Sequence, residues 1–496
     1  MSLINVSNLT FGYDGSYDTI FEKVSFQLDT NWKLGFTGRN GKGKTTFLKL
    51  LMGQYEYSGT IAASVDFSYF PFKIEQRERN TIDVVDSLSG NYAFWELQRE
   101  LSMLEVDYDV LYRPFSTLSE GEQTKVLLAV LFLRENQFLL IDEPTNHLDM
   151  ASRELVGQYL NTKRGFILVS HDRYFLDQCV DHILSISNTD IEVQRGNYTS
   201  WAENKERQDQ YELGENEKLK KEIAKMTAAA RRTAGWSDAV EKTKKGASRK
   251  LVAGLKPDRG YVGHKAAKMM KRSKVTEARK EKAIEEKSKL LKNIDWADEL
   301  AIKTLSYPKN RLIEARGLSI TYEGTTVFED VSFEVNRGDR VALSGKNGCG
   351  KSSILKAVLG EKICHTGDLI IGTHLEYSYV SQNTSFLAGS LRNYIRENSL
   401  DESLLKTILR KLGFSREQFD KRLEDYSSGQ KKKVLLAASL CKPAHFYIWD
   451  EPLNFIDVLS RIQIEHLICQ YQPTMLFVEH DRMFMENVAT KVVALR

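Results

Sequence analysis

Short apolar segments recur along the chain, and their patterning predicts its secondary structure. Polar and apolar residues alternate at residues 24–28 and 331–335, which predicts half-buried strands. Unbroken apolar runs at residues 138–141 and 446–449 predict strands that are buried on both faces of a sheet. Helical segments separate such strands in both halves of the chain. This alternation predicts an α/β fold with mostly parallel sheets.

Four motifs occur twice, in the same order and at nearly constant spacing. Paired positions lie 307 to 309 residues apart, a regularity that chance does not produce. The pairs are GRNGKGKT at residues 38–45 with GKNGCGKS at 345–352, LSEGE at 118–122 with YSSGQ at 426–430, DEP at 142–144 and 450–452, and HD at 171–172 and 480–481. The chain therefore contains one nucleotide-binding domain in duplicate.

The glycine-rich motifs predict two phosphate-binding loops. Each follows a short apolar strand and precedes a predicted helix, which is the context that this pattern requires. Backbone N–H groups and a helix N-terminus would face the phosphates of ATP, and the lysines would bridge its β- and γ-phosphates. The predicted nucleotide-binding residues of the loops are Gly38, Asn40, Gly41, Gly43, Lys44, Thr45, Thr46, Gly345, Asn347, Gly348, Gly350, Lys351, Ser352 and Ser353.

The remaining repeated motifs supply the polar groups that ATP hydrolysis needs. Asp142 and Asp450 end apolar strands, where they would support a Mg²⁺ ion that is also held by the hydroxyls of Thr45 and Ser352. The glutamate that follows each aspartate would polarise the attacking water, and a histidine after a further strand would contact the γ-phosphate. The predicted catalytic residues are Glu143, Glu451, His171 and His480.

The segment between the repeats is strongly basic. Residues 218–282 contain 21 Lys or Arg against 6 Asp or Glu, a net charge of +15, whereas the whole chain carries only +3. Apolar residues recur there every three or four positions, and glycines cluster at residues 246–263. The pattern predicts two long helices folded back as a hairpin, each of about 33 residues and roughly 50 Å. A solvated spacer is the alternative; the excess of positive charge favours a polyanion partner.

Composition narrows the protein class further. A chain of 496 residues with 42% hydrophobic residues is long enough for two or three packed domains. No apolar run approaches the roughly 18 residues that a bilayer requires, and the first residues do not resemble a signal peptide. The five cysteines are scattered, which is typical of a reducing cytoplasm without disulfides or zinc sites. We expect a cytoplasmic protein.

The downstream motifs resemble those of ABC ATPases. LSEGE and YSSGQ are similar to the ABC signature loop, which completes the nucleotide site of the opposite domain. This resemblance implies that Ser427 and Gly429 close the first site, and that Ser119 and Gly121 close the second. It adds Gln382 as a ligand of nucleotide and metal in the second site. It also suggests that Tyr13 and Tyr322 stack on adenine, although a tyrosine after a strand is also a common core residue.

Several positions depart from the ABC pattern. The loop that usually offers a glutamine reads YFPFK at residues 69–73, with Phe72 in the glutamine's place, whereas the second domain keeps Gln382. The second signature begins with Tyr426 instead of leucine. Both sites keep the lysine, the Asp-Glu pair and the histidine, so we expect both to bind ATP, with hydrolysis rates that need not be equal.

Two fused ABC domains and a basic linker resemble the ABC-F family over the whole chain. The predicted domains are residues 1–200, a helical-hairpin linker at 201–305, and residues 306–496. The resemblance implies a ribosome-binding ATPase whose hairpin reaches large-subunit RNA near the peptidyl-transferase centre, beside tRNA at the exit site. No membrane partner and no obligate protein subunit are expected.

A narrower resemblance, to the Lsa-like antibiotic-resistance group, rests on YIWDEPLNFID at residues 447–457, TNWKLG at 30–35 and KMMKRSK at 268–274. It implies ribosome protection from lincosamides, pleuromutilins and streptogramin A, with the hairpin tip at residues 251–262 near the drug site. Basic residues at 265–274 would grip RNA phosphates. A housekeeping ABC-F translation factor, an ATP-driven DNA-associated protein and, less plausibly, a transporter ATPase are the alternatives.

Overall fold

The computed structural model describes residues 2–13, 19–134, 137–146, 148–187, 190–245, 300–322 and 325–495. The chain divides into a compact unit, Met1–Trp201 with Ala297–Arg496, and a second unit, Ala202–Trp296. The compact unit contains two halves of the same build, which we call the first and second domains. The predicted α/β fold with two ABC-type domains is confirmed.

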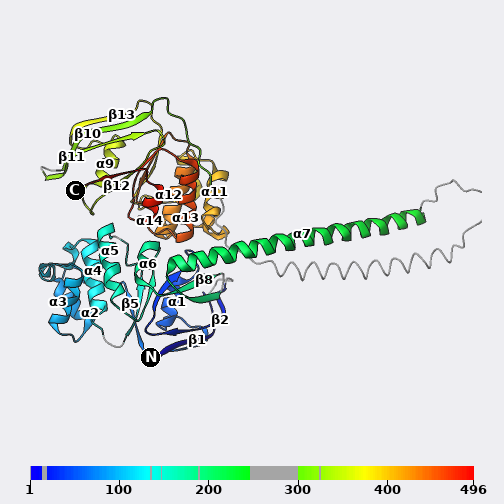
Figure 1. The fold of residues 1–496 in the computed structure, drawn as a ribbon, viewed down its shortest axis with the longest axis horizontal. Helices are drawn as coiled ribbons and strands as arrows, with labels where there is room; N and C mark the ends of the chain where they lie inside the picture. The colour runs from blue at the N-terminus through cyan, green and yellow to red at the C-terminus, as the bar shows by residue number, and fades with distance from the viewer. Residues whose placement is uncertain are drawn as a thin grey trace, which may run out of the picture. The chain divides into compact units, whose positions relative to one another are not determined.

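Two sheets form the first domain (Figure 1). Its strands are β1 Leu3–Gly12, β2 Thr19–Asp29, β3 Lys33–Thr37, β4 Ser58–Ala62, β5 Asp66–Phe70, β6 Gln137–Asp142, β7 Phe166–Val169, β8 His182–Ser187 and β9 Asp190–Arg195. One sheet is antiparallel, in the order β2-β1-β4. The other has the order β5-β6-β7-β3-β8-β9 and is parallel except at its β8–β9 edge.

Some helices of the first domain pack beside its sheets, and those at residues 81–117 precede the signature motif. They are α1 Lys44–Leu51, α2 Thr81–Ser89, α3 Phe94–Met103, α4 Glu120–Leu131, α5 Met150–Asn161 and α6 Arg173–Cys179, with short 3-10 helices η1 Tyr108–Tyr112 and η2 Phe115–Thr117. Phe47 of α1 packs between Phe21, Phe26 and Phe36, with ring centroids 5.6 to 6.1 Å apart. Burying one such side chain stabilises the fold by about 1.5–3 kcal/mol, so this cluster fixes α1 and the loop before it.

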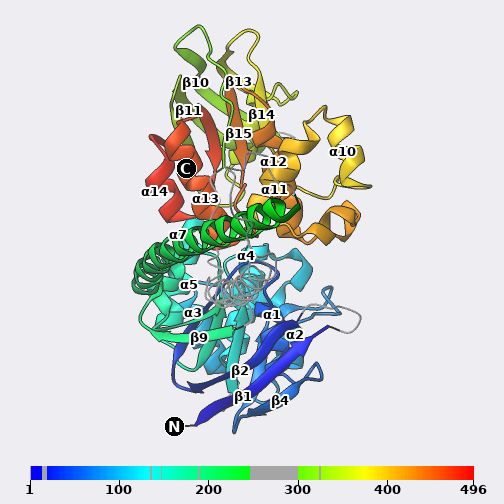
Figure 2. The same cartoon turned by 90° about the vertical axis from the view of Figure 1, so that its right-hand side faces the viewer.

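The second domain repeats this plan (Figure 2). Its strands are β10 Arg311–Tyr322, β11 Thr325–Asn336, β12 Arg340–Ser344, β13 His365–Ile371, β14 Tyr377–Val380, β15 Phe446–Asp450, β16 Met475–Val478 and β17 Lys491–Ala494. Its helices are α9 Lys351–Val358, α10 Leu391–Glu397, α11 Glu402–Lys411, α12 Ser428–Cys441, α13 Val458–Tyr471 and α14 Arg482–Val488, with η3 Arg416–Asp420 and η4 Leu423–Asp425. The sheet orders are β11-β10-β13, antiparallel, and β14-β15-β16-β12-β17, parallel.

The chain re-enters the compact unit before residue 305, where the linker was predicted to end. Leu300 and Ile302 are buried in the core of the second domain, and Thr304 pairs with Ala444. The domain boundaries at residues 200 and 305 stay a prediction.

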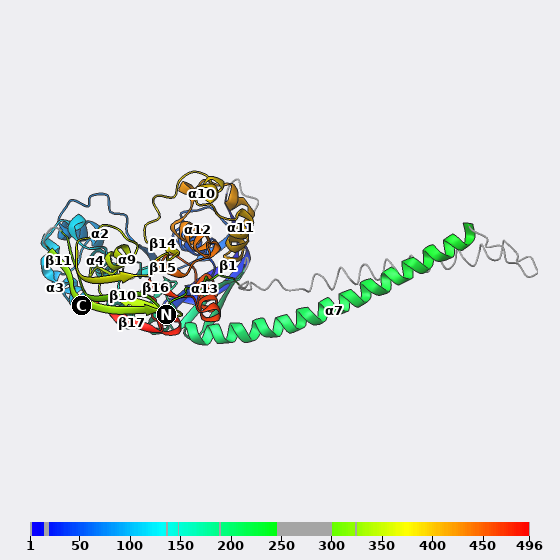
Figure 3. The same ribbon diagram turned by 90° about the horizontal axis from the view of Figure 1, so that it is seen from above.

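The linker begins as one long helix, α7 Tyr198–Lys245, which Figure 3 shows without a break. Its 48 residues correspond to about 70 Å at 1.5 Å per residue, longer than the predicted arm. Asp177 fixes its start, since the carboxylate accepts a hydrogen bond of 2.8 Å from the N–H of Thr199. The predicted tip, return arm and basic residues 265–274 lie outside the described residues. In the part of the chain that the structure describes, every helix is too short or too polar to cross a bilayer.

Candidate functional site

The two glycine-rich loops fold alike, one between β3 and α1 and the other between β12 and α9. Gly43 and Gly350 precede the helices with φ of 98° and 90°, a conformation that favours glycine. A Cβ at Gly43 would also lie 2.5 Å from Cγ2 of Ile20. The structure therefore brings the predicted loop residues together around two helix N-termini.

The lysine of each loop turns back across it. Lys44 Nζ donates to the carbonyl oxygen of Gly38 at 2.6 Å, and Lys351 Nζ donates to that of Gly345 at 2.8 Å. Both side chains are buried. Burial lowers the pKa of Lys44, while Asp457, Glu143 and Asp142 act in the opposite direction. A buried ammonium next to a helix N-terminus fits the phosphates of a nucleotide.

Hydroxyl and carboxylate oxygens lie where Mg²⁺ was predicted. Thr45 Oγ1 donates to Asp142 Oδ2 at 2.8 Å, and the Ser352 hydroxyl is close enough to Asp450 to influence its pKa. Burial raises the pKa of Asp450 to about 6, and its Oδ1 is buried without a hydrogen-bond partner among the described residues. Such hard oxygen donors fit Mg²⁺, which usually combines one or two carboxylates with phosphates.

The predicted catalytic glutamates both have left-handed backbone conformations, with φ of 51° at Glu143 and 46° at Glu451. Such strain is commonly retained at functional sites. Each carboxylate faces its predicted histidine: His171 Nε2 lies 3.3 Å from Glu143 Oε1, and His480 Nε2 lies 3.5 Å from Glu451 Oε1. Burial lowers the pKa of His171 well below its ordinary value, so this ring is neutral near pH 7.

The electrostatic environments of the two glutamates differ. Burial, followed by the neighbouring Asp142, raises the pKa of Glu143 to about 8. Burial also acts on Glu451, but His480 and the amide of Gln382 outweigh it and lower the pKa of that carboxyl. Gln382 Nε2 donates to Glu451 Oε2 at 3.0 Å, and the Asn454 amide donates to the same oxygen. Gln382, predicted as a metal ligand, thus contacts the glutamate in this structure.

The first domain fills the glutamine position differently. The ring of Phe72 lies 5.3 Å from the guanidinium carbon of Arg134, and Arg134 also donates to Ser68 Oγ at 3.1 Å. Tyr69 instead reaches the metal-site carboxylate, with its hydroxyl donating to Asp142 Oδ2 at 2.9 Å. Sequence reasoning missed this contact, since it concentrated on the absent glutamine.

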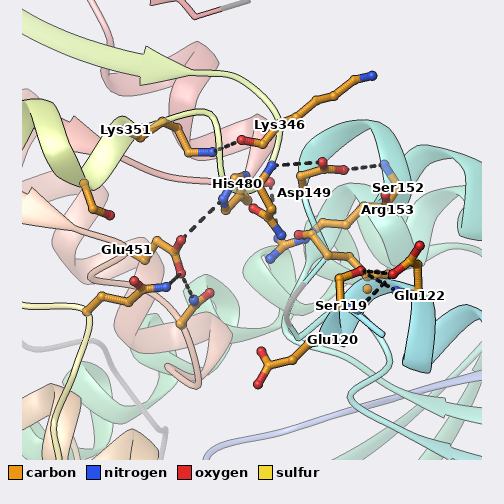
Figure 4. Close-up of a pocket in the computed structure, with 18 of the residues that line it drawn as sticks. Ser119, Glu120, Glu122, Asp149, Ser152, Arg153, Lys346, Lys351, Glu451 and His480 are labelled. Atoms are coloured by element: carbon orange, nitrogen blue, oxygen red, sulfur yellow. Dashed lines mark hydrogen bonds and ion pairs between the residues drawn. The ribbon is translucent and has the colours of Figure 1, made fainter. Parts of the chain in front are cut away.

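Residues of both domains surround the second nucleotide site. A pocket of about 1180 Å³ lies between the first-domain signature, Ser119 and Gly121, and the second-domain loop with Lys351 and Ser352. Figure 4 shows Ser119, Asp149 and Arg153 facing Lys351, Glu451 and His480 across it. The N–H of Asn347 donates to Asp149 Oδ2 at 3.3 Å, which joins the two domains at the pocket.

The first nucleotide loop contacts the second domain in a corresponding way. Asn40 Nδ2 donates to the carbonyl oxygen of Phe455 at 2.9 Å. A Cβ added to Gly429 would lie 2.4 Å from that oxygen and 3.1 Å from Asn40 Nδ2, so the signature loop passes too close for a larger residue. Both predicted pairs of glycine loop and opposite signature are therefore brought together.

Each signature serine is the N-cap of a helix. Ser119 Oγ accepts from the N–H of Glu122 at 3.2 Å, and Ser427 Oγ accepts from that of Gln430 at 3.3 Å. The capped helices, α4 and α12, have 12 and 14 residues. Their N-termini carry partial positive charge, which is suited to a phosphate of nucleotide bound to the opposite domain.

Tyr13 and Tyr322 lie on the surface and not in the core, each 43% exposed. Their hydroxyls hydrogen-bond at the glycine loops, with 2.7 Å to Thr46 Oγ1 and 3.1 Å to Ser353 Oγ. Tyr322 also lines the pocket. Exposed rings beside the phosphate loops are available for stacking on a base.

A family model described as ABC transporter matches residues 21–146 and 328–454, each of which includes a glycine loop, a signature and an Asp-Glu pair. The chain belongs to the ABC family. ABC domains bind and hydrolyse ATP, so the protein is an ATPase with two such domains.

Relatives align with the chain over nearly its whole length. The ribosome protection protein VmlR of Bacillus subtilis (strain 168) is 28% identical, over 100% of this chain and 86% of VmlR. ABC transporter F family member 2 of Arabidopsis thaliana is 26% identical, over 99% of this chain and 76% of that protein. These relatives and the two ABC domains group the chain with ABC-F family ATP-binding proteins.

A solved structure shares the fold. The complex of archaeal ribosomal stalk protein aP1 and the archaeal ribosome recycling factor aABCE1 aligns with a TM-score of 0.63 at 18% identity. The alignment covers 98% of this chain and 87% of the other. At this identity the likeness supports the two-domain fold alone.

Proposed function

We propose that this ABC-F protein binds the ribosome and protects its peptidyl-transferase centre from lincosamide, pleuromutilin and streptogramin A antibiotics. The observation that carries the proposal is the pocket lined by both domains, because a nucleotide held there would join them. VmlR, which aligns over the whole chain, is named a ribosome protection protein. The excess of Lys and Arg in the sequence of residues 218–282 favours an RNA partner.

In the proposed reaction the loop lysines bind the β- and γ-phosphates, and the signature serines reach them from the opposite domain. Thr45 with Asp142, and Ser352 with Asp450, would hold Mg²⁺, which neutralises phosphate charge when bound. Glu143 and Glu451 orient the attacking water and accept its proton, while His171 and His480 contact the γ-phosphate. Tyr13 and Tyr322 stack on adenine.

ATP binding is coupled to ribosome binding if the ribosome has a higher affinity for one conformation of the protein than for the other. ATP favours the arrangement in which both domains line the sites, and the ribosome binds this closed form better than the open one. Hydrolysis removes the shared ligand and releases the factor. The linker tip, at residues 251–262, approaches the drug site beside the tRNA of the exit site, and no membrane partner or obligate protein subunit takes part in this cytoplasmic cycle.

Cell-free bacterial translation inhibited by a lincosamide tests the proposal. Adding the protein should restore synthesis, and replacing residues 246–263 with a glycine-serine loop of equal length should abolish the rescue while ATP hydrolysis continues. The matched control replaces the glutamates, Glu143→Gln with Glu451→Gln. This variant should slow hydrolysis by about 10²- to 10⁴-fold and remain on the ribosome with ATP.

The other outcomes identify the alternatives. No rescue with a lincosamide, a pleuromutilin or streptogramin A, together with ATP-dependent ribosome binding, would indicate a housekeeping ABC-F translation factor. Preference for duplex DNA over ribosomes in a pull-down would contradict the ribosome assignment. Rapid release of the glutamate variant from ribosomes would contradict the proposed cycle.

A further inference from the structure

Two buried charges distinguish the second nucleotide site from the first. Lys432, on α12, is 2% exposed, and Glu479, which precedes His480, is 3% exposed. At the corresponding positions, 308 and 309 residues earlier, the first domain has the neutral residues Thr124 and Ser170. A buried lysine or glutamate costs free energy unless it is paired and hydrogen-bonded, so both charges need a physical reason.

Lys432 connects the loop of Gln382 with the strand that carries Asp450. Its ammonium donates to the carbonyl oxygens of Ser381 at 2.8 Å, Gln382 at 3.3 Å and Asp450 at 3.2 Å. Three carbonyl acceptors match the three hydrogens of an ammonium. The backbone of Gln382 is thereby held at a fixed distance from the end of β15, where Asp450 and Glu451 lie.

Glu479 connects the other two loops of the same site. Its Oε1 accepts from the N–H of Leu453 at 2.7 Å, and its Oε2 accepts from the N–H of His480 at 3.0 Å. Leu453 lies in the loop between Glu451 and α13, and its side chain is buried. Lys432 and Glu479 therefore hold the same short segment: Lys432 binds the carbonyl oxygen of Asp450, and Glu479 binds the N–H of Leu453.

At the corresponding positions the first domain makes fewer hydrogen bonds between loops. Thr124 Oγ1 donates at 2.9 Å to the carbonyl oxygen of Glu120, on its own helix. Ser170 Oγ lies 3.3 Å from Thr145 Oγ1 and accepts from the N–H of Asp172 at 3.1 Å. Among the described residues neither contact reaches the loop of Phe72, so these two positions do not connect that loop with the strand of Asp142.

We propose that Lys432 and Glu479 are positioning residues that hold the same segment, residues 450–453, and thereby keep Gln382, Asp450, Glu451 and His480 in the geometry for hydrolysis at the second site. Neither residue contacts the reacting atoms in this scheme; they act through the backbone of the residues that do. The inference rests on the proposed assignment of those four residues. It makes turnover at the second site depend on two buried charged residues whose positions in the first domain are occupied by neutral ones.

Single-turnover hydrolysis in a Glu143→Gln chain isolates the second site, and phosphate release by that parent chain tests the site assignment by itself. Lys432→Thr and Glu479→Ser, which install the first-domain residues, should each slow hydrolysis by about 10- to 100-fold, the cost of a small displacement of reacting groups. ATP affinity, measured with a fluorescent nucleotide, should change by less than about threefold because the phosphate loop is untouched.

Coupling is measured by the double variant. Lys432→Thr with Glu479→Ser should slow hydrolysis by clearly less than the product of the two single losses, because both residues hold the segment 450–453 and either change alone already releases it. The control is Lys431→Thr, the same change one position earlier at a half-buried lysine, which should leave the rate unchanged. Lys432→Gln, which keeps a donor without charge, replaces Lys432→Thr if thermal unfolding shows that the threonine variant is unfolded.

Three results would overturn the proposal. Independent, multiplicative losses in the double variant would show that the two residues are not coupled. Loss of ATP affinity or melting temperature without loss of single-turnover rate would show a structural role alone. An equal loss in Lys431→Thr would show that the effect is not specific to the buried lysine.

Discussion

The two nucleotide sites share the backbone conformation of the proposed catalytic glutamate but differ in the side chains around it. Glu143 and Glu451 share the same left-handed turn after a buried strand. Burial and Asp142 raise the pKa of Glu143 to about 8, whereas His480 and Gln382 overcome burial and lower that of Glu451. Under the proposed roles a general base works as the carboxylate, so we expect the second site to be the one prepared to hydrolyse ATP at neutral pH.

The partners of each glutamate explain the difference. Gln382 and Asn454 donate to Glu451, so its negative charge is stabilised by hydrogen bonds. In the first site Phe72, which has no hydrogen-bonding group in its side chain, replaces the glutamine and packs beside Arg134. The two domains share the glycine loop and the Asp-Glu pair. The residues beside each glutamate differ, and they change the pKa of its carboxyl.

The largest effect is expected when each of the two glutamates is replaced and the rates of ATP hydrolysis are compared. Glu451→Gln should lower steady-state ATP hydrolysis at pH 7 by about 10²- to 10⁴-fold, because it removes the base of the prepared site. Glu143→Gln should lower it by less than about 10-fold, since a carboxyl with a raised pKa is mostly protonated at that pH. Phosphate release measures both, and ATP affinity is the control. Equal losses in the two variants would refute the asymmetry.

A second difference concerns the lysine in the helix that follows each signature motif, Lys433 in the second domain and Lys125 in the first. Lys433 Nζ lies 2.5 Å from Asp457 Oδ2, and both side chains are buried. Removing one partner of such a pair leaves a buried charge, so Lys433→Met should lower the free energy of unfolding by about 3–5 kcal/mol. Its first-domain counterpart, Lys125, is half-buried, and Lys125→Met should cost about 1 kcal/mol or less. Urea unfolding measures both values.

The control for this loss removes the second charge as well. Lys433→Met with Asp457→Asn should recover most of the stability, because the amide can still cap α13 at Ser460 while no carboxylate is left unpaired. A double variant as unstable as Lys433→Met would show that the loss comes from packing and not from charge.

The same ion pair predicts an acid dependence of stability. Burial alone would raise the pKa of Asp457, but Lys433 outweighs it and the folded-state pKa is lowered. The unfolded chain, with an ordinary pKa of about 3.9, then takes up protons first as the pH falls. The stabilisation is complete above about pH 5 and is lost progressively below it. Melting temperatures between pH 6 and pH 3 should fall less steeply in Asp457→Asn than in the parent.

Local motifs account for what the sequence could predict. Strand, glycine loop and helix are contiguous in the chain, so the positions of Lys44 and Lys351 followed from spacing alone. The repeat at 307 to 309 residues likewise identified both Asp-Glu pairs and both histidines. The arm of the linker was predicted as a helix, but α7 is longer than expected, since its Lys-, Glu- and Ala-rich sequence continues to residue 245.

Contacts between residues far apart in the chain could not be predicted from the sequence. The Asn40 amide and the Phe455 carbonyl are 415 residues apart, and backbone carbonyls carry no residue-specific signal. Lys432 is one of three adjacent lysines in the sequence, and only the fold shows that Lys432 and Lys433 are buried while Lys431 is half-buried. One signal was available: aligning the two repeats places Thr124 opposite Lys432 and Ser170 opposite Glu479, a paired change from neutral to charged.

The smallest expected effect tests how the first site compensates for its missing glutamine. Tyr69 donates to Asp142 Oδ2 at 2.9 Å, the oxygen that also accepts from Thr45. Tyr69→Phe removes one hydrogen bond to a carboxylate, worth about 1.5–3 kcal/mol before water replaces it, so we expect a three- to tenfold rise in the Mg²⁺ concentration needed for ATP binding.

The measurement uses a Glu451→Gln chain, in which the second site binds ATP but does not turn it over, and follows nucleotide binding to the first site as Mg²⁺ is added. Tyr379→Phe is the matched control, because Tyr379 occupies the corresponding strand position, and its hydroxyl interacts with Ser381 in place of the metal-site aspartate. A normal Mg²⁺ requirement in Tyr69→Phe would mean that Thr45 alone orients Asp142. Equal shifts in both variants would mean that the tyrosines act through packing of β5 and β14, and the two sites would then be more alike than their glutamates indicate.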